Sequence, residues 1–213
     1  MDKYKETFET WDKLAGLYQE KFMHLDLYDD TYDLFCNELE PHAALLEIGC
    51  GPGNIAAYLL KKMPELKIDA NDISPNMIGL AQLNNPSAHC YVMDSRDISQ
   101  IEKKFDGIVA GFCIPYLSVP DTRQLVKDCN NLLNENGVLY ISFVEGNPGD
   151  SGYKAGSTGD RTYFYYHEWK VLEEMMKKDN FEILHLIHKS YKRNDGSEEL
   201  HSIAIAKKPK HSD

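Results

Sequence analysis

Short apolar runs alternate along the chain with amphipathic stretches in which apolar residues recur every three or four positions. The runs, each short enough for one strand, cover residues 45–48, 67–72, 89–93, 105–112 and 137–144. The amphipathic stretches, which lie near helix start signals such as Ser74-Pro75 and Pro120-Asp121, cover residues 54–63, 75–84 and 120–134. Apolar strands alternating with helices are typical of a parallel sheet that helices cover on both faces.

After residue 166 the pattern changes to helix, strand, turn and strand. The helix is predicted in "HEWKVLEEMMKKDN" and the strands in "FEILHLIHKSYKR" and "HSIAIAKK". Asn194, Asp195 and Gly196 lie between these strands and form a hairpin turn signal, so we expect antiparallel pairing at the sheet edge. The predicted fold class is therefore α/β, with a doubly wound, mostly parallel sheet of seven strands and an antiparallel edge hairpin.

Two segments lie outside this regular pattern. Residues 2–23 place six large apolar side chains on one helix face, namely Tyr4, Phe8, Trp11, Leu14, Tyr18 and Phe22. This helix either docks on the sheet or, in addition, roofs a ligand site. Residues 146–162 are rich in glycine and long for a connection, so we expect a loop with little reason to hold one conformation. That loop is either a flap that closes over a substrate or a linker.

Charge and composition narrow the classes of partner. The chain has 213 residues, enough for one well-buried domain, and its formal net charge is −11. An acidic chain without basic patches is a poor binder of nucleic acid or anionic membrane. No apolar run approaches the roughly 18 residues of a spanning helix, and the first residues lack the apolar core of a signal peptide, so we expect a cytoplasmic protein. The five cysteines form no C-x-x-C pair, so neither a disulfide nor a metal site is expected.

The stretch "LLEIGCGPGN", residues 45–54, joins the first predicted strand to the first helix. Ligands of open α/β sheets bind at such strand ends, and glycines let them approach the backbone. The dinucleotide fingerprint fails because Asn54 stands where its third glycine belongs, and the phosphate loop fails because no lysine follows Gly53. Glu47 in this stretch would also repel a pyrophosphate.

Two further acids follow the next strands. Asp72 lies 19 positions after Gly53, where an acid can accept both ribose hydroxyls, and Asp94 can accept an adenine amino group. With Glu47 they line the carboxyl edge of the sheet, and we expect no basic partner in the same loops. This pattern favours a cationic nucleoside as the ligand.

The segment "LLEIGCGPG", followed by Asp72, Asp94 and "FDGIVAGFCIPYL" in order, resembles the motifs of class I S-adenosylmethionine-dependent methyltransferases over roughly residues 40–145. The resemblance implies their Rossmann-like fold, S-adenosylmethionine as cofactor and S-adenosylhomocysteine as product. It implies that Glu47 faces the methionine ammonium and that Asp72 binds the ribose. The full set of cofactor-binding residues that it implies is Tyr18, Glu47, Gly49, Cys50, Gly51, Gly53, Asp72, Ile73, Asp94, Ser95, Gly111 and Phe112.

Methyl transfer from a sulfonium is an in-line displacement, which depends mainly on geometry and exclusion of water. Where the acceptor must lose a proton, His167 is the candidate catalytic base and His24 a second one; His167 can equally be a histidine near the start of the last helix. The candidate substrate-binding residues are Tyr116, Tyr163, Tyr165 and Tyr166. The expected organisation is one domain, residues 1–213, with a helical cover (1–40), a cofactor-binding core (41–145), a substrate loop (146–166) and a final helix with hairpin (167–213).

Two other classes of function stay open. Tyr166 and Lys170 have the Y-x-x-x-K spacing of nicotinamide-dependent short-chain reductases, although the position and spacing of the glycines do not suit that family. A non-catalytic protein that binds S-adenosylmethionine is the other alternative, because fold never guarantees activity. A small-molecule acceptor is preferred by elimination. Its identity and the oligomeric state are not specified by the sequence.

Overall fold

The computed structural model describes residues 2–156, 158–193 and 196–210. Its main sheet has seven strands in the order β3-β2-β1-β4-β5-β9-β8. Strands β1 to β5 pair in parallel, and β9 is antiparallel to both of its neighbours. The strands of this sheet are β1 (Ala44–Ile48), β2 (Lys67–Asp72), β3 (His89–Val92), β4 (Phe105–Gly111), β5 (Leu133–Val144), β8 (Glu182–Lys192) and β9 (Glu198–Lys207). The predicted fold class is confirmed.

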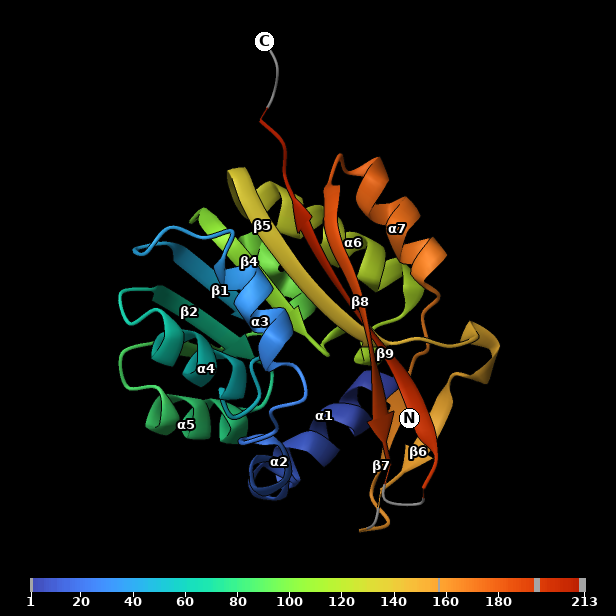
Figure 1. Cartoon of the computed structure of the whole chain (residues 1–213). Helices are drawn as coiled ribbons and strands as arrows, with labels where there is room; N and C mark the ends of the chain where they lie inside the picture. Colours follow the sequence, from blue (N-terminus) through green and yellow to red (C-terminus); the bar gives the residue numbers. More distant parts are fainter. Residues whose placement is uncertain (1, 157, 194–195, 211–213) are drawn as a thin grey trace.

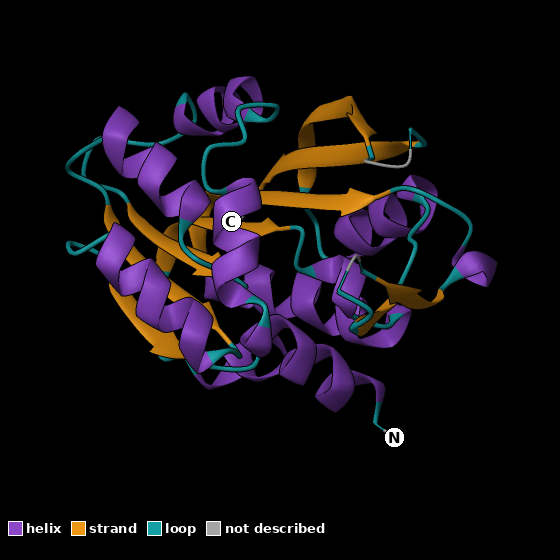
Figure 2. Cartoon of the chain, turned by 90° about the horizontal axis from the view of Figure 1, so that it is seen from below, coloured by secondary structure: helices purple, strands orange, loops and turns teal. Residues whose placement is uncertain are grey.

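Helices cover both faces of this sheet (Figures 1 and 2). They are α3 (Asp29–Cys36), α4 (Asn54–Lys62), α5 (Pro75–Asn84), α6 (Val119–Leu132) and α7 (Trp169–Lys178), with short 3-10 turns η1 (Ser95–Gln100) and η2 (Ile114–Tyr116). Side chains of α6 and α7 share one apolar cluster with Leu46 and Ile108, whereas α3 and α4 share the other with Leu45 and Val109. Neighbouring strand residues thus face opposite layers, as the continuous apolar runs predict.

The predicted helix over residues 2–23 is broken into α1 (Lys3–Lys13) and α2 (Ala15–Phe22). Leu14 caps α1 with φ −95° and ψ 11°, outside the helical region, so the chain changes direction there. The rings of Trp11 and Tyr18 come to lie edge to face, with centroids 5.4 Å apart. Figure 1 shows α1 and α2 below the strand ends. The apolar face of residues 2–23 was predicted correctly. The break at Leu14, which allows side chains of both α1 and α2 to line the same pocket, was not predicted.

The glycine-rich segment was expected to hold no single conformation, and that expectation is wrong for its described residues. The turn η3 (Pro148–Asp150) leads into a two-stranded antiparallel hairpin of β6 (Gly152–Ala155) and β7 (Arg161–Phe164). The cause is tertiary, because α1 completes the hydrogen bonding of β7. The Tyr163 N–H donates to Thr7 Oγ1 at 2.9 Å, and Thr10 Oγ1 donates to the Arg161 carbonyl at 2.9 Å.

The edge hairpin of β8 and β9 forms as predicted. Two residues of its predicted turn, Asn194 and Asp195, lie outside the described residues. Gly196 is described and has φ +83°, a left-handed conformation that suits glycine. Among the described helices, none is long and apolar enough to cross a membrane.

Candidate active site

A pocket opens at the carboxyl ends of β1, β2 and β4, beneath α1 and α2. Ten of the predicted cofactor- and substrate-binding residues line it: Tyr18, Gly49, Gly51, Asp72, Ile73, Asp94, Ser95, Gly111, Phe112 and Tyr116. They come from segments far apart in the sequence, and the parallel strands bring them to one edge of the sheet. This is the edge at which open α/β sheets bind their ligands.

The glycine loop between β1 and α4 needs glycine for its backbone. Gly49, Gly51 and Gly53 have φ of +66°, +54° and +81°, all in the left-handed region. A Cβ on Gly53 would lie 2.3 Å from Asn85 Nδ2, so this glycine serves packing against α5. A Cβ on Gly51 would point toward Tyr18, 3.6 Å from its Cε1 atom. Gly51 therefore keeps open the space between the loop and the roof.

Glu47, a predicted cofactor-binding residue, lies on β1 just before the glycine loop and is not among the residues that line the pocket. It is 2% exposed, and among the described residues its Oε2 atom has no hydrogen-bond partner. Burial raises its pKa to about 8, because the charged form is poorly solvated there. A nearby cation would favour the charged form and supply the missing interaction.

Asp72 is held in a fixed orientation at the end of β2. Its Oδ2 accepts the Gly51 N–H at 2.9 Å and its Oδ1 accepts the Ser74 N–H at 2.9 Å. Burial raises its pKa, and these two backbone donors oppose the shift in part. Each oxygen retains a lone pair for a ligand, since a carboxylate offers about four acceptor sites.

The expectation that these acids lack a basic partner is wrong for Asp94. The guanidinium of Arg96, two residues later, donates from Nε to both Asp94 oxygens at 3.0 and 3.1 Å. Burial alone raises the pKa of Asp94, but the hydrogen bonds from Arg96 outweigh it and hold the pKa below its usual value. Arg96 also lies over the Tyr4 ring, 4.1 Å from its centroid. The two acids of the pocket therefore differ, because only Asp94 is neutralised by a neighbour.

Between the acids the wall is apolar. Ile73, Met77, Met93 and Leu117 line it, and only the first of these was a predicted site residue. The others contribute side chains without a recognisable motif, so no sequence signal pointed to them. An apolar wall in the same pocket as Asp72 and Asp94 suits a nucleoside base.

The roof consists of Tyr4, Thr7, Phe8, Trp11 and Tyr18, all from α1 and α2. It is tied down at both ends of α1. The Tyr4 hydroxyl donates to Asp121 and accepts the Ser118 N–H, and at the other end Ser74 Oγ and the Asn76 N–H both donate to Asp12 Oδ1. The helical pattern of residues 2–23 thus predicted a face that does line the pocket.

Phe112, which also lines the pocket, follows β4 with φ +52°, which is unusual for a residue other than glycine. The Ser142 hydroxyl accepts its N–H at 2.9 Å and stabilises this conformation. The Phe112 ring packs against Tyr28 and His201, whose hydroxyl and Nδ1 are 2.7 Å apart. Neither of these two residues was predicted, because they come from distant segments without a motif.

Other predicted site residues lie away from the pocket walls. Cys50 and Gly53 belong to the glycine loop, but both are buried and neither lines the pocket. Tyr163 and Tyr165 lie behind Tyr4, with the rings of Tyr4 and Tyr165 stacked at 6.4 Å, and Tyr166 packs against Gly146. The structure does not bring these three tyrosines to the pocket.

His167, the predicted base, is 4% exposed and lies beside a second, apolar cavity between α6 and α7. Its Nε2 is 2.8 Å from the Ile114 carbonyl oxygen, and burial lowers its pKa. His24 lies in the turn after α2 and is likewise absent from the pocket lining. The described pocket walls therefore contain neither candidate base.

Comparisons with known proteins agree with this geometry. Residues 45–137 match a family model described as a methyltransferase domain. A trans-aconitate 2-methyltransferase of Enterobacter sp. (strain 638) is 36% identical over 107 residues, which are 50% of this chain and 41% of that protein. A malonyl-[acyl-carrier protein] O-methyltransferase of Ilyobacter polytropus is 28% identical over 73% of this chain and 59% of that protein. The chain thus spans less than two thirds of the length of these curated relatives.

Among solved structures, a SAM-dependent methyltransferase from Methanosarcina mazei has the same fold. The TM-score is 0.72 at 20% identity, with 84% of this chain and 98% of the other covered. At this identity the likeness concerns the fold.

Proposed function

We propose that the chain is a class I S-adenosylmethionine-dependent methyltransferase, which transfers a methyl group from S-adenosylmethionine to a small-molecule acceptor and releases S-adenosylhomocysteine. The observation that carries this proposal is the pocket itself. It brings together, at one edge of the sheet, a glycine loop, Asp72, an apolar wall and an aromatic roof. Unlike Asp94, Asp72 is not neutralised by a neighbouring arginine.

The residues present fit such a cofactor. Gly51 leaves room between the loop and Tyr18, where any side chain would protrude. Glu47 offers a buried carboxylate oxygen that has no hydrogen-bond partner among the described residues. In this proposal Asp72 accepts the ribose hydroxyls, and Ile73, Met77 and Met93 hold the adenine. Ser95 and Asp94 lie at the adenine edge, where Arg96 must share Asp94 with the adenine amino group. Glu47, partly uncharged near neutral pH, ionises when the cofactor's ammonium lies nearby.

The bound cofactor would supply an electrophilic methyl group on a positively charged sulfur. The chain's own contribution is to hold the acceptor in line with that methyl group and to exclude water. Trp11, Tyr18 and Phe112 close the pocket with apolar surface. No histidine is among the described residues that line it, so in this proposal transfer depends on placement rather than on a histidine base.

A small acceptor is favoured by the charge and by the enclosure. The net charge of −11 disfavours nucleic acid, and the roof leaves room for a compact molecule. The two similar curated proteins are named for a small acid and for an acyl-carrier-protein substrate. The nicotinamide alternative has no support from the family match, because residues 45–137 match a methyltransferase domain.

Calorimetry tests the cofactor. S-adenosylhomocysteine and S-adenosylmethionine should bind, and NAD should not. Tight binding of NAD with no heat from either sulfur compound would overturn the proposal.

A second experiment separates an enzyme from a non-catalytic binder. The protein is incubated with methyl-labelled S-adenosylmethionine and a metabolite extract, and labelled products are identified by mass. Formation of S-adenosylhomocysteine together with one labelled small molecule is expected. Binding without turnover would favour the non-catalytic alternative.

A further inference from the structure

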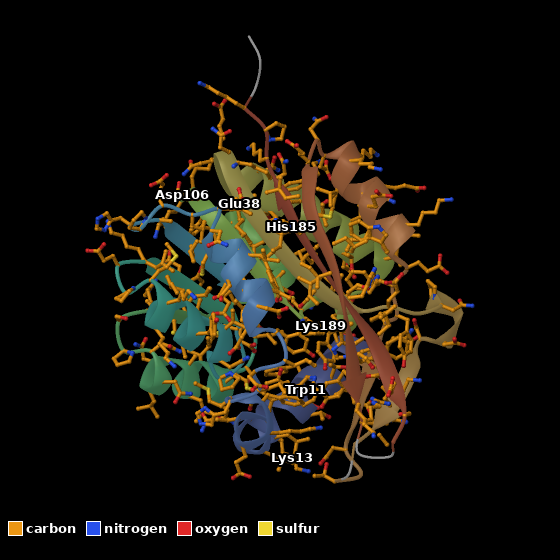
Figure 3. The ribbon with its side chains drawn as sticks, viewed as in Figure 1. Trp11, Lys13, Glu38, Asp106, His185 and Lys189 are labelled. Carbon is orange, nitrogen blue, oxygen red and sulfur yellow. The ribbon has the colours of Figure 1, made fainter. Side chains whose placement is uncertain are left out.

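Trp11 carries a buried hydrogen-bond donor that finds no partner among the described residues. The side chain extends from α1, is labelled in Figure 3 and lines the pocket, and its Nε1 atom is buried. An indole offers one donor and no acceptor, so only an oxygen or nitrogen of another group can satisfy it. Buried donors in folded proteins are nearly always paired. An unpaired donor in a pocket wall therefore indicates that a ligand supplies the missing acceptor atom.

The surroundings of Trp11 restrict that ligand. The Tyr18 and Tyr116 rings meet the indole edge to face, with centroids 5.4 and 5.7 Å away. Phe8 and Phe112 line the same pocket. Aromatic walls favour a flat, apolar body. The missing partner should accordingly be one oxygen on an otherwise apolar molecule.

Tyr116 places a second polar group near the indole. Burial raises the pKa of its phenol, and the nearby indole N–H opposes that rise. The indole N–H and the phenol oxygen are close enough to interact, but they do not meet the geometry of a hydrogen bond. The phenol stays protonated at neutral pH, so an indole N–H and a phenol O–H are both available as donors.

We propose that Trp11 Nε1–H, with the Tyr116 hydroxyl beside it, binds an oxygen atom of the methyl acceptor, and that the acceptor is a flat apolar molecule bearing a carboxylate, carbonyl or phenolic oxygen. This inference rests on the proposed function. In that proposal the cofactor's ribose hydroxyls, adenine amino group and ammonium face Asp72, Asp94 and Glu47, and none of them is assigned to Trp11 or to Tyr116 of η2.

The test uses the two tryptophans of the chain, Trp11 and Trp169. Protein with 15N-labelled indoles is first titrated with S-adenosylhomocysteine and then with benzoate, phenol or acetophenone. Toluene serves as the matched molecule without oxygen. At least one oxygen-bearing probe should move the Trp11 indole proton downfield on the loaded protein, toluene should not, and the Trp169 signal should stay in place.

Variants give the second measurement. Trp11→Phe keeps an aromatic ring but removes the donor, and should weaken binding of the effective probe about tenfold, equivalent to about 1.4 kcal/mol. Tyr116→Phe should weaken it as well. Trp169→Phe, on α7 and outside the pocket, is the matched control and should bind like the parent.

The outcomes separate this inference from the proposed function. A protein that does not bind S-adenosylhomocysteine removes both. If S-adenosylhomocysteine alone moves the Trp11 proton downfield, the donor belongs to the cofactor and this inference is wrong. It is equally wrong if none of the three probes binds to the loaded protein, or if Trp11→Phe binds them as tightly as the parent.

Discussion

Two cavities among the described residues are each lined by a residue chosen from the sequence, and they differ in what surrounds that residue. Asp72 lines the pocket at the strand ends, where the backbone N–H groups of Gly51 and Ser74 fix its carboxylate and glycine leaves space in front. His167 lies beside the cavity between α6 and α7, with its Nε2 bound to a backbone carbonyl and apolar side chains around it.

His167 is buried and Asp72 is partly buried, and burial displaces the pKa of both. Burial and a shifted pKa therefore do not distinguish a ligand-binding group from a structural one. What distinguishes Asp72 from His167 is the open space at the carboxyl edge of the sheet, which lies within reach of the unused lone pairs of the Asp72 carboxylate. Four changes test this distinction.

The largest effect is expected from Gly51→Val. The backbone there has φ +54°, and a side chain would fill the gap beneath Tyr18. Affinity for S-adenosylhomocysteine should fall at least about a hundredfold, or about 2.7 kcal/mol, by calorimetry. Gly79→Val is the control, because a Cβ at that position meets nothing within 4 Å. A folded Gly51→Val protein with normal affinity would mean that the loop is not the site.

Glu47→Gln should change the pH dependence of stability. Burial raises the pKa of Glu47 from 4.5 to about 8, so between these values the folded state binds more protons than the unfolded state. The free energy of unfolding then falls as pH rises through this window, by about 1.4 kcal/mol per unit from this group. Urea denaturation of the free protein at pH 5.5 and 7.5 should show a loss about 2 kcal/mol smaller in the variant. Equal losses in the variant and the parent would contradict the assignment; Glu9→Gln, at an exposed position, should behave like the parent.

Asp72→Ala should weaken cofactor binding about tenfold, because charge-assisted hydrogen bonds contribute about 1.5 to 3 kcal/mol each. Asp69→Ala is a matched control on the same strand, since Asp69 pairs with Lys103 at 2.9 Å and does not line the pocket. Calorimetry of both variants provides the comparison. Equal affinities would remove Asp72 from the site.

The smallest effect is expected from His167→Asn. Loss of the contact with Ile114 should cost about 1 kcal/mol of stability, while cofactor affinity and turnover stay within about twofold of the parent. Single-turnover rates with the identified acceptor measure this. A large fall in rate with unchanged cofactor affinity would restore His167 as the catalytic base and erase the difference between the two cavities.

The sheet was predictable because each strand is encoded locally. The apolar runs at 45–48 and 105–112 report burial on both faces, and Ser74-Pro75 marks a helix start that the structure places at Pro75. Glu47 and the glycines were identified for the same reason, since they stand together in one short motif, and Asp72 was identified by its distance of 19 positions from Gly53. The ion pair of Asp94 with Arg96 was also within reach, because the two residues are two positions apart.

What escaped prediction depends on contacts between distant segments. The β6/β7 hairpin has a glycine-rich sequence with no strong strand pattern and is completed by Thr7 and Thr10 of α1. Helix α3 was not distinguished within the helical cover, although Tyr32 and Phe35 anchor it to the sheet. Met77, Met93 and Leu117 line the pocket only because helix α5, the segment after β3 and the segment after η2 converge there.

The attachment of α1 to β7 also sets the order in which the site can be completed. Thr10 hydrogen-bonds to Arg161, 151 residues further along the chain. Contacts of such long sequence separation form late, because a large loop must close before they give any stabilisation. During synthesis, α1 leaves the ribosome well before β7 exists to hold it. The contacts that join α1 to β7 therefore form late, and a nascent chain that contains every residue of the glycine loop still lacks them.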